Sequence, residues 1–177
     1  MLYPYEPALW RNVFIMLGSS SAGLIGLLFI ASSLHIKEIV GNPVFHRRAF
    51  NNTCYLLIIF IEALLILVPQ PVQVLGAELI AINLVGLSLP LRFIYLFFQN
   101  ENVFRRGGGS LFLGVVFSAS FLLGAAGGVV LFAQLGWGIC LVAASCGVLL
   151  IKVVLAAWSI LAGVGHLPIA SNKTFTR

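Results

Sequence analysis

Three ionisable side chains lie deep inside long apolar runs, and they are the residues whose types suggest chemistry. Two are carboxylic acids, Glu62 and Glu78, and the third is an amine, Lys152. An unpaired ion at the centre of a lipid bilayer costs about 2.5–3.5 kcal/mol on insertion scales. We therefore expect Glu62 and Lys152 to pair with each other, to become neutral, or to line water.

Other polar side chains recur at spacings that place them on shared helix faces. Ser145, Lys152 and Ser159 repeat every seven residues, which is close to two helical turns. If these polar faces all point into the interior of the helix bundle, they predict a polar path or a substrate or ion site. Its residues would be Glu62, Glu78, Lys152, Ser145, Ser159 and Asn83. The alternative is structural: a Glu62–Lys152 pair that fixes the register of two helices.

The apolar runs that carry these residues are long enough to cross a membrane. The chain of 177 residues is 60% hydrophobic and 8% charged, contains no aspartate, and has a mean hydropathy of +1.08. A run of about 20 apolar residues spans the hydrocarbon core as a helix. We predict one all-α domain, residues 1–177, a polytopic membrane helix bundle with transmembrane helices at 13–34, 49–68, 74–98, 111–133 and 138–161.

The connections between the spans predict the orientation. Residues 69–73 and 134–137 are short and uncharged, whereas 35–48 and 99–110 contain arginines and lysine. Basic residues in short loops favour the cytoplasmic side. The N-terminus is therefore predicted outside and the C-terminus in the cytoplasm. The formal net charge of +5 comes from these scattered residues, so we expect no nucleic-acid partner.

Small residues recur at four-residue spacing in two of the spans. In lipid the hydrophobic effect does not drive contact between helices, so association depends on close packing. Small residues therefore mark the faces where helices approach closely. The predicted packing residues are Gly18, Ala22 and Gly26 in the first span, and Ser120, Gly124 and Gly128 in the fourth. These faces are expected to pack within the chain or to form the seam of a homo-oligomer.

The residue patterns that several kinds of metal site and enzyme active site require are absent from the sequence. The three cysteines and three histidines have no metal-ligand spacing, so we predict no metal and no cofactor and interpret the cysteines as small buried hydrophobic residues. HExxH and GxSxG motifs are absent, and a chain without aspartate has no aspartyl protease pair. Ser145 and Ser159 lie two turns from Lys152, an awkward reach for a serine–lysine dyad. We predict that the protein is not an enzyme.

The first half of the chain resembles a loose group of small bacterial polytopic membrane proteins. The likeness lies in 21–33, Pro43, Arg48-Ala49, 67–70 and 75–79. Some members of that group carry a label as modulators of a membrane-bound AAA protease. The resemblance implies the bacterial inner membrane and an accessory role. It also implies that Glu78, within a Pro-Gln…Gly-Ala-Glu-Leu pattern, fixes the outer turn.

Two functions compete on this sequence. The first is a small oligomeric channel or proton-linked transporter, with Glu62, Glu78 and Lys152 along its path. The second is an accessory or regulatory subunit that docks on another membrane protein through its glycine faces. An intramembrane enzyme or cofactor carrier ranks third. The expected partners are the lipid bilayer and either further copies of the chain or another membrane protein.

Overall fold

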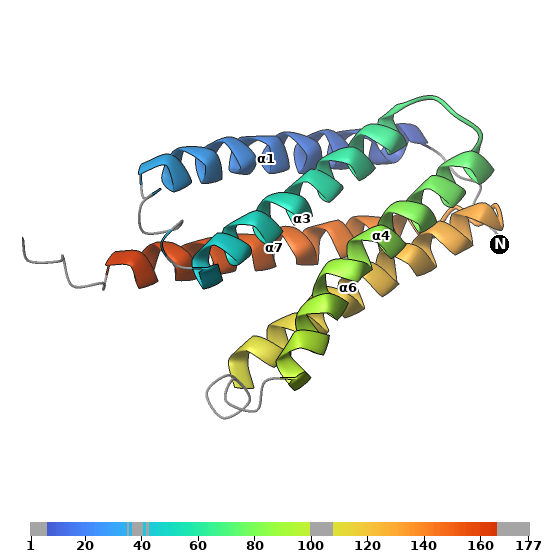
Figure 1. Ribbon diagram of the computed structural model, residues 1–177. Coiled ribbons are helices and arrows are strands. Elements are labelled where there is room, and N and C mark those ends of the chain that lie inside the picture. Colours follow the sequence, from blue (N-terminus) through green and yellow to red (C-terminus); the bar gives the residue numbers. More distant parts are fainter. Residues whose placement is uncertain (1–6, 35, 37–40, 42, 100–107, 166–177) are drawn as a thin grey trace, which may run out of the picture.

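A computed structural model describes residues 7–34, 36, 41, 43–99 and 108–165. They form five long helices without any strand: α1 (Pro7–Leu34), α3 (Pro43–Leu67), α4 (Val72–Gln99), α6 (Gly108–Phe132) and α7 (Gly138–Gly165) (Figure 1). Each contains a segment long and apolar enough to cross a membrane. The predicted all-α bundle with five transmembrane helices is thus confirmed, and the chain is a multi-pass membrane protein. The side on which each terminus lies stays a prediction.

The helices extend past the predicted spans. α1 begins at Pro7 rather than at Val13, and α3 begins at Pro43, before the predicted start at Ala49. Proline suits the first helical position, because its fixed φ is already helical and its missing N–H has no partner there. The helical hydrogen-bond ladder therefore continues beyond the apolar segment at both sites.

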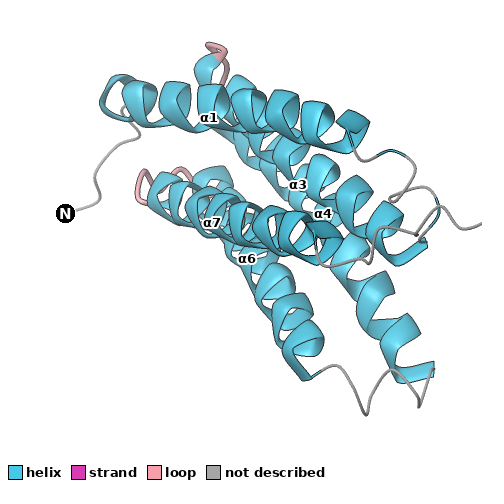
Figure 2. Ribbon diagram, turned by 90° about the vertical axis from the view of Figure 1, so that its left-hand side faces the viewer, coloured by secondary structure: helices cyan, strands magenta, loops and turns pink. Residues whose placement is uncertain are grey.

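Two short connections lie at one end of the bundle, which we call the turn end: residues 68–71 between α3 and α4, and 133–137 between α6 and α7 (Figure 2). At the second turn, Gln134 has a left-handed φ of 62°. The amide of Gln134 donates to Leu131 O at 2.8 Å and that of Leu135 to Val130 O at 3.0 Å. This is the Schellman pattern, which satisfies the last carbonyls of a helix. The opposite end, where α4 ends and α6 begins, is the loop end.

The packing order differs from the order along the chain. α4 packs most extensively on α6, and α3 packs most extensively on α1 (Figure 1). α7 contacts α6, α3 and α1. α3 and α4 are joined by a tight turn but share a smaller contact. The most extensive contacts are thus α4–α6, α1–α3 and α6–α7, and α7 also joins the α1–α3 pair.

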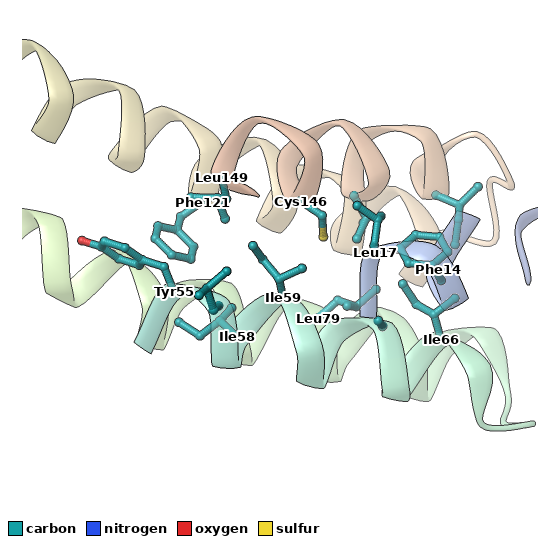
Figure 3. Close-up of a cluster of buried hydrophobic side chains, with 14 of the residues drawn as sticks. Phe14, Leu17, Tyr55, Ile58, Ile59, Ile66, Leu79, Phe121, Cys146 and Leu149 are labelled. Atoms are coloured by element: carbon teal, nitrogen blue, oxygen red, sulfur yellow. The ribbon is translucent and has the colours of Figure 1, made fainter. Parts of the chain in front are cut away.

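Buried side chains fill the space between these helices. Phe14 and Leu17 from α1 lie near the turn end, beside Ile66 (Figure 3). Nearer the loop end, the ring of Tyr55 stacks on Phe117 with centroids 4.5 Å apart. Ile59 and Cys146 lie between these two groups (Figure 3). The core therefore runs along the bundle axis rather than forming one compact centre.

Glycines set how closely α4 and α6 approach. A Cβ atom added at Gly76 would lie 2.8 Å from Gly128 O and 2.6 Å from Phe132 N. A Cβ at Gly128 would lie 3.0 Å from Gly76 O. Any side chain at either position would push the two backbones apart. The small-residue face predicted in the fourth span thus lies inside the chain.

The small-residue face predicted in α1 divides into two parts. Gly18 is buried, and a Cβ atom there would lie 3.1 Å from that of Ala63 on α3. Ala22 and Gly26 are exposed, and a Cβ at Gly26 would meet nothing within 4 Å. Only the Gly18 end of this face is therefore used within the chain.

Candidate functional site

Glu62 is placed in the core by the periodicity of α3. Tyr55, Ile59, Glu62 and Ile66 follow one another at spacings of three or four residues, and all four are buried. The exposed fraction of Glu62 is 0%. The helix face that buries apolar side chains above and below thus also carries a carboxyl group into the interior of the membrane-spanning segment Ala49–Leu67.

Both carboxyl oxygens of Glu62 accept a hydrogen bond from a neutral side chain. Asn83 Nδ2, on α4, donates to Oε1 at 2.6 Å. The Cys146 thiol, on α7, donates to Oε2 at 2.9 Å. Asn83 Nδ2 also donates to Leu79 O at 2.9 Å, which orients the amide. The carboxyl group of Glu62 therefore links three helices at one point.

A fourth helix completes the walls of this site. Ser145 Oγ, on α7, donates to Ser120 O on α6 at 2.7 Å. A Cβ atom at Gly124 would overlap the Asn83 amide and lie 2.9 Å from Ser145 Oγ. Gly124 is thus the residue that lets the amide reach Glu62. Asn83 Oδ1 is buried and accepts no hydrogen bond from the residues that the structure describes.

Lys152 lies outside this cluster. The described hydrogen bonds to Glu62 come from Asn83 and Cys146. Lys152 is half-buried, six residues past Cys146 toward the end of α7, or about 9 Å along the helix axis. Of the three-residue face on α7, Ser145 lines the site, whereas the side chain of Ser159 lies outside the described residues.

Glu78 belongs to a separate arrangement at the turn end. Gln70 Nε2 donates to Glu78 Oε2 at 2.8 Å and to Leu65 O at 3.2 Å. The Gln70 side chain thus joins the start of α4 to the last turn of α3. This geometry is the one expected if Glu78 fixes the turn, and it does not bring Glu78 to Glu62.

Cys146 is the member of the site that sequence reasoning missed. It had been interpreted as a small buried hydrophobic residue, and its burial agrees with that. Its hydrogen bond to Glu62 spans 84 residues of sequence, and an isolated cysteine in an apolar run carries no spacing signal. Among the described residues, no group of three or more histidine, cysteine or acidic side chains is placed to hold a metal ion.

The chemistry available to this site is proton binding. An ionised Glu62 would accept a hydrogen bond from both Asn83 Nδ2 and the Cys146 thiol, which lie within hydrogen-bond distance. A proton on Oε2 would turn the carboxyl group into a donor there, and the Cys146 sulfur, which is also a weak acceptor, would receive it. The site is therefore compatible with both protonation states at almost the same side-chain positions.

No protein family model, curated protein or solved structure matches this chain. The resemblance of its first half to small bacterial membrane proteins stays a prediction. Function is therefore inferred from the residues around Glu62.

Proposed function

We propose that the protein is a small proton-linked transporter or channel subunit in which Glu62 is the group that binds and releases the proton. The proposal rests on the surroundings of this carboxyl group. It is fully buried in a membrane-spanning helix, and both of its oxygens accept hydrogen bonds from neutral side chains of two other helices. Ionisable residues within membrane spans are costly and usually mark ion paths or proton relays.

The neighbours of Glu62 favour exchange of a proton over a permanent ion pair. A fixed cation beside the carboxylate would hold it in the ionised form, whereas an amide and a thiol stabilise the ion only through single hydrogen bonds. Asn83 and Cys146 are neutral donors of this kind. Neither of these donors is a cation, so loss of the charge on Glu62 leaves neither with an unpaired charge, and their contacts are compatible with both states.

The location of the site links proton binding to helix packing. Glu62, Asn83 and Cys146 belong to α3, α4 and α7, so a change at the carboxyl group acts on three helices together. Five helices form a thin bundle, and we expect several copies to assemble into a complete path. Lys152, further along α7 and half-buried, would be the next polar group on that path.

The test is proton flux in liposomes that contain the purified full-length protein and an internal pH-sensitive dye. We expect Glu62→Gln to abolish the flux driven by an imposed potential, because an amide cannot release a proton. Glu78→Gln is the matched control: the same change, at an acid that the structure places at the turn. Equal flux in Glu62→Gln and wild-type protein, at equal reconstituted amounts, would overturn the proposal.

A second candidate, an accessory subunit, is favoured by one observation. The exposed side of α1 carries Ser19, Ala22, Gly23 and Gly26, and a Cβ at Gly23 or Gly26 would meet nothing within 4 Å. Such a face lets another helix approach closely in lipid. Gly26→Leu should then release a co-purifying membrane protein, whereas Ala119→Leu, on an exposed part of α6, should not. Retention of the same partner by both variants would exclude docking through this face.

A further inference from the structure

α4 contains the only proline inside a described helix, Pro90. Proline has no N–H and its ring clashes with the carbonyl group four residues earlier, which weakens the helix at that turn. The residue four positions before Pro90 is Gly86. The Gly86 carbonyl therefore lacks its helical donor, and glycine itself restricts the backbone less than any other residue.

The same turn has a second perturbation. Ser88 Oγ donates to Val85 O at 2.6 Å, a side-chain bond of the kind that bends helices. A Cβ atom at Gly86 would overlap the ring of Phe121 on α6. Gly86 is thus a second place, besides Gly76, where α4 lies close against α6. Proline and glycine–serine combinations are the usual causes of sharp helix bends.

The two parts of α4 on either side of this turn are held differently. Toward the turn end, Gly76 lies against the backbone of α6 and Asn83 is bonded to Glu62, one helical turn before Gly86. Past Pro90, three of the four residues whose side chains are described, Leu91, Arg92 and Tyr95, are exposed. Segments with few buried contacts open most readily. The part of α4 before Gly86 is therefore fixed to the site, whereas the side chains described past Pro90 are mostly exposed.

We propose that the turn from Gly86 to Pro90 is a hinge through which the proton state of Glu62 moves the loop-end part of α4 relative to α3. This inference rests on the proposed function only in taking Glu62 as the proton site. A hydrogen bond to a charged acceptor is about twice as strong as one to a neutral acceptor. Asn83, and with it the turn before the hinge, is thus held more firmly to α3 when Glu62 is ionised.

Two side chains from other helices are described in hydrogen-bond contact with Glu62. α4 presents the neutral Asn83, and α7 presents Cys146, which is the titratable side chain described in contact with the carboxyl group. Replacing Glu62 by glutamine imitates the protonated state, since it removes the charge and keeps the shape. The hinge can therefore be tested without a pH change.

The test measures distances between pairs of spin labels in the full-length protein in lipid nanodiscs. One pair is Tyr95→Cys on α4 with Phe50→Cys on α3, past the hinge; the reference pair is Leu84→Cys with Leu57→Cys, before it. The background replaces Cys54 and Cys140 by alanine and retains the buried Cys146. Tyr95 lies nine residues past Gly86, about 13 Å along the axis, so a bend change of about 20° moves it by about 5 Å.

We expect Glu62→Gln to shift the Tyr95–Phe50 distance by about that amount and to leave the reference distance unchanged. Pro90→Ala restores the missing N–H and should abolish the shift, and Ser88→Ala, which retains the proline, should reduce it. No shift in Glu62→Gln, or an equal shift in both pairs, would overturn the hinge. So would a shift that persists in Pro90→Ala. Flux that disappears in Glu62→Gln without any distance change leaves the proton site standing and removes only the hinge.

Discussion

Gly124→Ala is the smallest substitution that tests how the site is built. It adds one methyl group at a position where the Asn83 amide and Ser145 Oγ already fill the space. Inserting a methyl group into a well-packed interior costs about 1–3 kcal/mol. If the amide must also leave Glu62, the lost hydrogen bond adds about 0.6 kcal/mol, and at most about 1.7 kcal/mol, in a membrane protein. The higher helix propensity of alanine offsets about 0.5–1 kcal/mol of this cost, so we expect a total loss of about 1–4 kcal/mol.

The matched control is Gly147→Ala, on α7. It is the same change in the interior of a helix, but a Cβ there would meet nothing within 4 Å. Because alanine is the better helix former, this variant should gain about 0.5–1 kcal/mol. The free energies of unfolding are to be measured by titration of the purified protein in mixed micelles with a denaturing detergent.

A double variant separates the cost that arises from the Asn83 amide from the cost that arises from Ser145. In an Asn83→Ala background the main obstacle to the new methyl group is gone, so Gly124→Ala should cost less there than in the wild-type chain. The remaining cost would come from Ser145. If Gly124→Ala proves no more harmful than Gly147→Ala, the amide is not held against Gly124 and the described site is wrong.

Three further predictions follow from other contacts. Gln70→Leu and Glu78→Leu should each lower the free energy of unfolding by about 1 kcal/mol, and the double variant should cost less than their sum, because both break the same hydrogen bond. A maleimide should label the exposed Cys140 of the folded protein in detergent and reach the buried Cys146 only after unfolding, as read by intact mass. Gly86→Ala should cost about 1–3 kcal/mol, measured by the same detergent titration, because the facing ring must move.

The helices of this protein are predictable from sequence, and the reason is physical. A run of about 20 apolar residues in lipid has to satisfy its backbone groups internally, and the helix does so. The depth of Glu62 follows from counting residues along the run. The burial of Asn83, another member of the predicted polar path, is observed as well.

The partners of these residues are less predictable. Pairing with Lys152 was one of three expectations for Glu62, beside neutralisation and contact with water, and the hydrogen bonds described to its carboxyl group come from Asn83 and Cys146. Residues of opposite charge can be identified as potential partners from the sequence alone. A thiol donates a hydrogen bond only where the packing of the helices brings it close to an acceptor, and the sequence does not show that packing. Small residues likewise predict that a helix face packs closely, but they do not predict which helix packs against it. Gly76 of α4, for example, lies against Gly128 of α6 and not against α3.

The bond between Asn83 and Glu62 also bears on how the chain enters its membrane during synthesis. The two residues lie 21 positions apart, on consecutive helices joined by a short turn. They emerge from the ribosome one after the other and meet as soon as that helical pair enters the bilayer. Each then shields the other from lipid before α6 and α7, which carry Ser120, Gly124 and Cys146, pack around them. The carboxyl group of Glu62 thus enters the membrane together with its amide partner, and the later helices close around the pair.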